Sequence, residues 1–362
     1  MTQPKKEPFG LYIHWPYCLS KCPYCDFASS VSKKIDEDIL LKGYLRDLIV
    51  FKEKFNIQKE ITSIFFGGGT PSLMSEKLFD TLINEIAKKF KLSNDIEISL
   101  EANPDAITKE KMKNFSTSGL NRLSLGVQSL NEKDLLFLGR KHSLKTALQR
   151  IDEAKNIFKR INIDLIYARP RHALKAWEKE LTNALSLGLK HYSLYQLTLE
   201  EGTVFYKKNI PQISETQAAR LYCLTQEIMQ NAGLPAYEIS NHAAKNEECK
   251  HNLLYWEGND YMGIGPAAHG RMNLIATQNF KNPLQWLSNG LMFTKLTPKE
   301  REEEKLLMGL RLINKGYPIT NINPEKIKIA LQNNWIILQK NKIYTTLKGR
   351  LLLNKLILLL FD

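Results

Sequence analysis

The chain has five cysteines, of which three lie close together near the amino terminus and two are isolated: Cys18, Cys22, Cys25, Cys223 and Cys249. An odd number of cysteines, three of them too close in sequence to pair, argues against a disulfide framework. Thiolates bind soft and borderline metals, so the three-cysteine cluster predicts either a structural zinc site or an iron–sulfur cluster. Zinc usually takes four ligands, and only His14 is a nearby candidate for the fourth. Three thiolates on one loop favour a [4Fe–4S] cluster whose fourth iron can bind a substrate.

A glycine-rich segment, Gly67-Gly68-Gly69-Thr70-Pro71, supplies a second kind of ligand contact. It is neither a G-x-G-x-x-G fingerprint nor a P-loop, because no Lys-Ser/Thr pair follows it. Glycines after a strand let the backbone approach a ligand closely and expose its N–H and C=O groups. A tight turn without a ligand is the alternative interpretation of this segment.

These residues follow apolar runs that alternate with longer amphipathic stretches. The predicted strands are Leu11–His14, Ile61–Phe66, Ile96–Leu100, Arg122–Gly126, Ile161–Ile166 and Tyr192–Gln196. The predicted helices between them include Glu37–Lys54, Glu76–Phe90, Ser143–Phe158 and Leu174–Leu187. Such alternation predicts right-handed βαβ units around a parallel sheet. Polar or glycine residues stand at or near the carboxyl end of every strand, where parallel α/β proteins carry their chemistry.

The pattern changes after residue 200, and we expect three parts: residues 1–200, 201–297 and 298–362. A helix is predicted near Glu215–Asn231, followed by an aromatic and polar stretch and the glycine-rich segment Gly263–Gly270. The last part is predicted to be a small, mainly helical domain of winged-helix type, with a hairpin at Trp335–Thr345. Its apolar end, Leu351–Phe361, is too short to span a bilayer and predicts a core helix, with contact to a membrane surface as the alternative.

Composition predicts an ordinary globular protein of 362 residues, 43% of them hydrophobic. The formal charge of +13 raises the alternative of a zinc-stabilised nucleic-acid-binding protein. Lysines are spread along the chain without a long basic block, so we expect no nucleic-acid partner. The amino terminus shows no apolar segment of the signal-peptide type, which predicts a cytoplasmic location.

The motif Cys18-x3-Cys22-x2-Cys25, with Tyr24 before its third cysteine, resembles the signature of the radical S-adenosylmethionine superfamily. The resemblance implies a partial (β/α)6 barrel whose open iron binds S-adenosylmethionine. It also implies that an electron from the cluster can cleave this cofactor into methionine and a 5′-deoxyadenosyl radical. The positions that it assigns to S-adenosylmethionine are Tyr12, Tyr24, Gly68, Gly69, Thr70, Glu101, Gln128, Arg140 and Asp164.

Longer segments narrow the resemblance to the coproporphyrinogen dehydrogenase-like group. They include the runs at residues 22–27, 121–129 and 164–167 and the Gly263–Gly270 segment. Within this group the chain resembles the haem chaperones of the HemW type more than the oxygen-independent coproporphyrinogen III oxidases. The oxidases have a fourth cysteine where this chain has Phe27, and a long amino-terminal extension before the first strand, which is expected here at residue 11.

The third distinguishing feature is His251-Asn252-x2-Tyr255-Trp256, which resembles the H-N-x-x-Y-W motif of the HemW type. The resemblance associates these four residues with haem. A histidine flanked by aromatic side chains also suits haem physically, because iron takes an axial imidazole and the macrocycle packs on aromatic faces. We therefore expect His251 to be the axial ligand. For Cys249, a buried free thiol is favoured over a role toward haem.

The resemblance implies the cofactors [4Fe–4S], S-adenosylmethionine and haem, and a function in handing haem to an acceptor protein. Candidate partners are a respiratory, membrane-associated acceptor and an electron donor such as a flavodoxin or ferredoxin. Radical decarboxylation of coproporphyrinogen III is the alternative function. The chain departs from the group's pattern at Ala168–His172, where relatives have a Gly-Leu-Pro-like turn, at Ala267, where they have glycine, and at His242–Glu248.

Overall fold

The computed structural model describes residues 7–320 and 322–361. Its centre is an eleven-stranded sheet with the order β13-β12-β11-β10-β1-β4-β5-β6-β7-β8-β9. The strands β1, β4, β5, β6, β7 and β8 run parallel to their neighbours in this group. Their bounds are Gly10–Trp15, Ile61–Gly68, Leu92–Ala102, Arg122–Gln128, Arg160–Tyr167 and His191–Gln196. These are the six strands that the sequence predicts.

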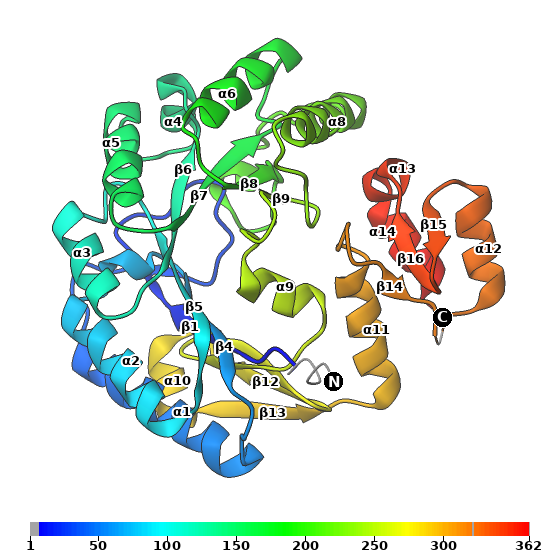
Figure 1. Ribbon diagram of the computed structural model, residues 1–362. Helices are drawn as coiled ribbons and strands as arrows, with labels where there is room; N and C mark the ends of the chain where they lie inside the picture. Colours follow the sequence, from blue (N-terminus) through cyan, green and yellow to red (C-terminus); the bar gives the residue numbers. More distant parts are fainter. Residues whose placement is uncertain (1–6, 321, 362) are drawn as a thin grey trace.

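Helices cover the outer side of the curved sheet (Figure 1). The helices that follow its strands are α1 (Glu37–Phe55), α2 (Glu76–Lys89), α3 (Lys109–Thr117), α5 (Leu144–Lys155), α6 (Leu174–Ser186) and α8 (Glu215–Asn231). Most begin at a side chain that caps the first free N–H groups, such as Ser75 for α2 and Ser143 for α5. The strands between them are buried on both faces, which explains why they appear in the sequence as nearly continuous apolar runs.

The sheet curves without closing in the part of the chain that the structure describes, because β13 and β9 stand at its two ends. This confirms the predicted partial barrel. One large hydrophobic cluster fills the space between the sheet and its helices, and it includes Trp15, Phe66, Phe79 and Trp177.

Strands after residue 240 extend both ends of the sheet, and the sequence did not predict this extension. The strand β10 (Tyr261–Ile264) adds parallel to β1, and β11 (His269–Met272), β12 (Ile275–Asn279) and β13 (Leu291–Lys295) continue antiparallel. At the other end, β9 (Asn241–Ala243) pairs antiparallel with β8. These strands are short and carry many polar residues, so they lack a strong apolar pattern.

The carboxyl-terminal part has a separate hydrophobic cluster that includes Leu306, Ile336 and Leu356. It consists of α11 (Pro298–Gly309), α12 (Pro324–Gln332), α13 (Leu347–Leu351), α14 (Leu353–Leu360) and a sheet of β14 (Tyr317–Pro318), β16 (Lys342–Thr345) and β15 (Ile336–Gln339). Helices with a three-stranded sheet agree with the expected small, mainly helical domain. The division of the chain at residues 200 and 297 stays a prediction.

The remaining short elements position the sites described below. They are β2 (Tyr17–Cys18), β3 (Ser30–Val31), a 3₁₀ turn at Pro71–Leu73, α4 (Glu132–Phe137), α7 (Val204–Lys207), α9 (Lys250–Trp256) and α10 (Pro283–Asn289). The helix α9 lies between the barrel and the carboxyl-terminal part and contacts both β4 and α11 (Figure 1). None of the helices among the described residues has the length and apolarity that a membrane crossing requires.

Candidate functional site

A cavity of about 410 Å³ opens at the carboxyl ends of the parallel strands. Its wall is formed by the loop after β1, the glycine-rich segment after β4 and the ends of β5, β6 and β8. Ten of the twelve residues predicted to bind the cluster or S-adenosylmethionine line it: Cys18, Cys22, Cys25, Tyr24, Gly69, Thr70, Glu101, Gln128, Arg140 and Asp164. The structure thus brings together side chains that are up to 146 positions apart in the sequence.

The cysteine loop is tied to the barrel by backbone hydrogen bonds. Cys18 ends the short strand β2, and the amide of Cys25 donates to the carbonyl of Cys22 at 3.1 Å, which forms a turn. The amide of Gly69 donates to the carbonyl of Trp15 at 2.7 Å. A Cβ atom on Gly69 would lie 2.5 Å from the carbonyl oxygen of Tyr17 and 3.0 Å from the Cys18 sulfur. Glycine is required here because the loop and the glycine-rich segment approach so closely.

Arg140 connects the cysteine loop with the strand ends. Its Nη1 lies 3.3 Å from the Cys22 sulfur, and its Nη2 donates to Asn103 Oδ1 and to the Gly126 carbonyl, both at 2.7 Å. Its Nε is buried without a partner among the described residues. A buried guanidinium of this kind stabilises a thiolate and can bind a carboxylate. Asn103, which orients Arg140, was not predicted as a site residue, although it follows Glu101 at the end of β5.

Two carboxyl groups face each other across the cavity floor. Burial and the nearby Asp164 raise the pKa of Glu101 to about 8, although the Gly68 amide donates to this carboxyl at 3.3 Å. Burial also raises the pKa of Asp164 to about 6, opposed by hydrogen bonds from side chains that include Ser124. A bound cation would lower both pKa values, since an opposite charge favours the ionised form. The ammonium and sulfonium groups of S-adenosylmethionine are cations of this kind.

Gln128 holds a strained backbone conformation at the end of β6. Its φ angle is 72°, and the pairing with β7 shifts register between Leu125 and Gln128. Bulges and left-handed non-glycine residues concentrate at functional sites, where they redirect a side chain. The bulge directs the Gln128 side chain to the cavity, as expected for a ligand contact.

Two of the predicted cofactor residues lie behind the cavity wall. The Gly68 amide contacts Glu101, as described above. The Tyr12 hydroxyl lies 3.0 Å from His14 Nδ1, and His14 Nε2 lies 2.8 Å from the Ala28 carbonyl oxygen. Both ring nitrogens of His14 are therefore engaged, so this histidine is not available as a fourth metal ligand. Tyr12 and His14 instead support the loop that carries the cysteines.

The arrangement of donors can be tested against a mononuclear metal. No group of three His, Cys, Asp or Glu side chains within residues 7–320 and 322–361 lies close enough together to hold one ion. All three loop cysteines are free thiols. A [4Fe–4S] cluster binds each thiolate through a different iron, so it accepts thiolates that are farther apart than those of a zinc site. The donor set fits a cluster better than it fits zinc.

The four residues predicted to bind haem lie away from this cavity, on or next to α9. His251 is buried at the amino-terminal end of the barrel, where its Nδ1 lies 2.9 Å from Ser63 Oγ and its Nε2 lies 2.7 Å from the Tyr255 hydroxyl. Its ring stacks on Phe65, with ring centroids 5.2 Å apart. Burial lowers the pKa of His251 to about 3, so the imidazole is neutral.

The other two residues of this motif point elsewhere. Asn252 donates to the Tyr237 hydroxyl at 3.3 Å. Trp256 is half-buried at the end of α9 and faces the carboxyl-terminal part, where the Arg311 guanidinium lies 5.6 Å from its ring centroid. The motif therefore joins the barrel to the carboxyl-terminal part.

Cys249 is a buried thiol next to this motif, as the sequence favoured. Its sulfur lies 3.5 Å from Glu97 Oε1, and burial raises its pKa to about 12. Glu97 also accepts from the Lys250 amide at 2.8 Å and pairs with Arg122 and Arg160, both at 2.9 Å. This network fixes the start of α9 to β5.

Comparisons with known proteins agree with this geometry. The model of the radical SAM superfamily matches residues 12–182, from β1 to α6. The haem chaperone HemW of Buchnera aphidicola (from Schizaphis graminum) is 37% identical, over 99% of this chain and 100% of the relative. The chain belongs to the HemW family of radical S-adenosylmethionine proteins. Membership of this superfamily implies a [4Fe–4S] cluster and S-adenosylmethionine as cofactors.

Two further comparisons extend the similarity of this HemW family member. The HemW of Haemophilus influenzae is 34% identical over 98% of both chains. Among solved structures, coproporphyrinogen III oxidase (HemN) of Escherichia coli superimposes with a TM-score of 0.83 over all of this chain and 92% of that one. The two chains are only 20% identical, so this likeness shows the fold alone.

The departures from the group's glycine pattern have a structural cost. Ala168, after β7, has a φ angle of 60°, and Ala267, between β10 and β11, has a φ angle of 61°. Both alanines therefore adopt the left-handed conformation that glycine tolerates best. The turn after β7 is held by Arg169, which pairs with Glu180 at 2.6 Å and donates to the Ile166 carbonyl at 2.8 Å. Buried polar contacts of Arg169 thus take the place of a flexible glycine turn.

Proposed function

We propose that this protein is a haem chaperone, which binds haem and transfers it to an acceptor protein, and that it carries a [4Fe–4S] cluster with an exchangeable S-adenosylmethionine. The observation that carries the proposal is the similarity to HemW chaperones over nearly the whole chain, including both the barrel and the carboxyl-terminal part. The position of the oxidases' fourth cysteine is taken by Phe27, which is 55% exposed at the cavity. A location in the cytoplasm belongs to the same proposal.

The cofactor cavity gives each proposed residue a role. Cys18, Cys22 and Cys25 are the proposed cluster ligands, and when bound, the cluster and S-adenosylmethionine supply one-electron chemistry. Glu101 and Asp164 hold the cationic groups of the cofactor, and Arg140 binds its carboxylate. The backbone of Gly68, Gly69 and Thr70 approaches it closely, and Tyr24 packs on Phe205 to close the side of the cavity.

The proposed haem residues are those of the H-N-x-x-Y-W motif. Ligation of iron by His251 requires that its bonds to Ser63 and Tyr255 break, because both ring nitrogens are engaged. This role therefore stays a prediction, and His251→Ala tests it. Loss of haem binding with fold and cluster intact would support His251 as the ligand, and unchanged binding would exclude it.

Haem transfer and porphyrinogen turnover distinguish the two candidate functions. The haem-loaded, anaerobically reconstituted protein is mixed with apomyoglobin as a surrogate acceptor, and transfer is followed by the change in the Soret band. The same preparation is supplied with coproporphyrinogen III, S-adenosylmethionine and a flavodoxin or ferredoxin as electron donor. We expect haem transfer without protoporphyrinogen formation. Turnover of coproporphyrinogen without haem transfer would overturn the proposal in favour of the oxidase.

A further inference from the structure

We propose that haem is received in a second cavity, between α9 and the carboxyl-terminal part, where Trp256 and Tyr317 flank the macrocycle and Lys315 and Lys342 bind its propionates. This inference rests on the proposed haem chaperone function and gives it a location. The cavity measures about 770 Å³, within the usual range for pockets that bind drug-sized or cofactor-sized ligands.

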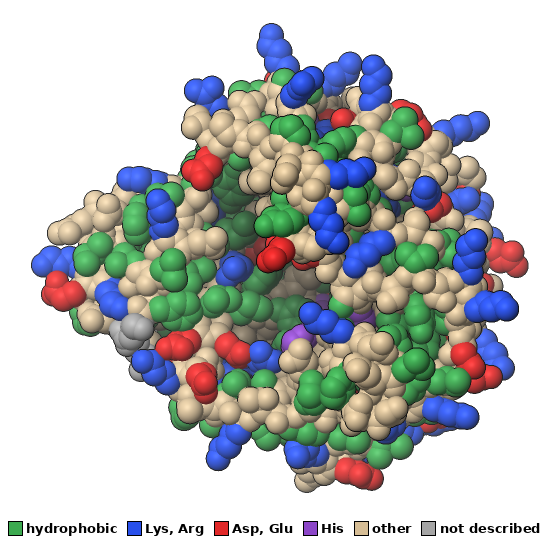
Figure 2. Space-filling view, turned by 180° about the vertical axis from the view of Figure 1, so that it is seen from behind, with side chains coloured by type: hydrophobic (Ala, Val, Ile, Leu, Met, Phe, Trp, Pro, Cys, Tyr) green, Lys and Arg blue, Asp and Glu red, His purple; other side chains and the backbone are tan. Residues whose placement is uncertain are grey.

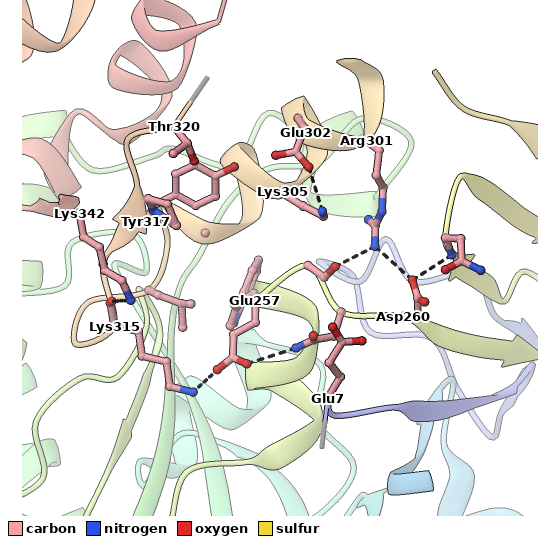
Figure 3. Close-up of a pocket in the computed structure, with 18 of the residues that line it drawn as sticks. Glu7, Glu257, Asp260, Arg301, Glu302, Lys305, Lys315, Tyr317, Thr320 and Lys342 are labelled. Atoms are coloured by element: carbon pink, nitrogen blue, oxygen red, sulfur yellow. Dashed lines mark hydrogen bonds and ion pairs between the residues drawn. The ribbon is translucent and has the colours of Figure 1, made fainter. Parts of the chain in front are cut away.

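The second cavity lies at the opposite end of the barrel from the cofactor cavity. It is lined by residues that precede strands, such as Glu7 before β1, Lys59 before β4 and Asp260 before β10. The opposite wall comes from α11 and the segment around β14 (Figure 3). Haem bound here would not compete with S-adenosylmethionine for space.

Aromatic surface is available on both walls. Trp256, the last residue of α9, contributes one wall, and its Nε1 is buried without a hydrogen-bond partner among the described residues. Tyr317 contributes the other, and its ring packs against Gly309, where a Cβ atom would lie 2.3 Å from it. A flat conjugated ligand gains most from such aromatic faces. Trp256 is the residue of the H-N-x-x-Y-W motif that lines this cavity, whereas His251 is enclosed in the barrel.

Cationic side chains gather on the wall that the carboxyl-terminal part contributes (Figure 3). Lys342 donates to the backbone carbonyl of Lys315 at 3.2 Å rather than to a carboxylate. Lys315 pairs with Glu257, and Lys305 pairs with Glu302 at 2.9 Å. Exposed ion pairs of this kind contribute little, so a propionate can replace the carboxylate of Glu257 at small cost. Two lysines about one wall match the two propionates of haem.

The experiment compares haem with a derivative that has no propionate charges. Hemin and hemin dimethyl ester are titrated into the anaerobically reconstituted protein and into Lys315→Gln/Lys342→Gln. The matched control is Lys113→Gln/Lys179→Gln, which removes the same charge from exposed positions on α3 and α6. All of these lysines are at the surface, so we expect every variant to fold.

We expect the dissociation constant for hemin to rise about tenfold in the Lys315/Lys342 variant, since two charge-assisted contacts are lost. The ester should bind the variant and the unaltered protein equally, and the control pair should leave both ligands unaffected. Hemin binding that is unchanged in Lys315→Gln/Lys342→Gln, or equally weakened for hemin and its ester, would overturn the location. Absence of hemin binding by the unaltered protein would instead overturn the proposed function.

Discussion

Arg140 is the side chain through which the cysteine loop, β5 and β6 meet. Its guanidinium bonds to Asn103 and Gly126 and lies beside Cys22, which leaves the buried Nε free of partners among the described residues. At the scale of single residues, this is where a carboxylate ligand gains most, because a buried, oriented guanidinium has already lost its hydration.

Arg140→Gln is expected to raise the dissociation constant for S-adenosylmethionine at least tenfold, since a hydrogen bond to a charged group contributes roughly 1.5–3 kcal/mol. Calorimetric titration of the reconstituted protein measures this, and its iron and sulfide content checks that the cluster is intact. Arg150→Gln is the control, because Arg150 pairs with Glu153 on α5, outside the cavity. Equal cofactor affinity in Arg140→Gln and the unaltered protein would remove Arg140 from the site.

The two cavity carboxyl groups predict how cofactor affinity depends on pH. The pKa of Glu101 is raised to about 8 and that of Asp164 to about 6. A cationic ligand binds their ionised forms, so affinity for S-adenosylmethionine should increase as the pH rises from about 6 to about 8. Titrations across this range measure the increase.

Glu101→Gln provides the control for this pH dependence. The amide cannot ionise, so the increase near pH 8 should disappear and affinity should be lower at the upper end of the range. The SAM-free protein has the opposite dependence: a raised carboxyl pKa contributes stability at low pH that is lost as pH rises through about 8. An affinity that is flat between pH 6 and pH 8 in the unaltered protein would contradict this account of the cavity.

At the scale of elements, α9 owes its position to the buried carboxylate of Glu97. That side chain accepts the first amide of the helix and pairs with Arg122 and Arg160. Glu97→Gln should lower the free energy of unfolding by about 3 kcal/mol, because it leaves a buried guanidinium without its counter-charge. Thermal denaturation of the reconstituted protein measures the loss as a lower apparent Tm.

Glu85→Gln is the matched control for Glu97. Glu85 pairs with Lys88 and Lys89 on the surface of α2, where solvent screens the ion pairs. We expect no measurable change in the apparent Tm for this variant. If both substitutions had the same effect, Glu97 would not be the residue that fixes α9.

The left-handed alanines give a prediction of opposite sign. Ala267→Gly should increase the free energy of unfolding by about 0.5–1 kcal/mol, because relief of the left-handed strain exceeds the entropy that glycine adds to the unfolded chain. Ala147→Gly, in the interior of α5, should instead decrease it by about 1 kcal/mol or more. Apparent Tm values of the two variants measure this, and a decrease in Ala267→Gly would refute the strain.

The elements of the barrel could be predicted from the sequence far better than those around it. The strands β1 and β4 to β8 are apolar and buried, so their patterns are strong, and the ends of those strands carry the predicted cofactor residues. The extension from β10 to β13 was not predicted, because its polar strands are specified by pairing with distant partners. The environment of His251 was also hidden, since Ser63 lies 188 positions away in the sequence.

At the scale of the whole molecule, the barrel separates two cavities. The cofactor cavity opens at the carboxyl ends of the strands, and the proposed haem cavity lies at their amino ends, against the carboxyl-terminal part. The charge of +13 is not concentrated in one basic surface on the face shown in Figure 2, where Lys and Arg are scattered among acidic side chains. That distribution agrees with the expectation of no nucleic-acid partner.

The most direct test of the central claim is a titration of hemin into the anaerobically reconstituted protein, followed by its Soret absorption. The account predicts saturation at one haem per chain, with a defined ligand-bound spectrum that is retained when S-adenosylmethionine is added. Weak binding that does not saturate, together with turnover of coproporphyrinogen III, would contradict it.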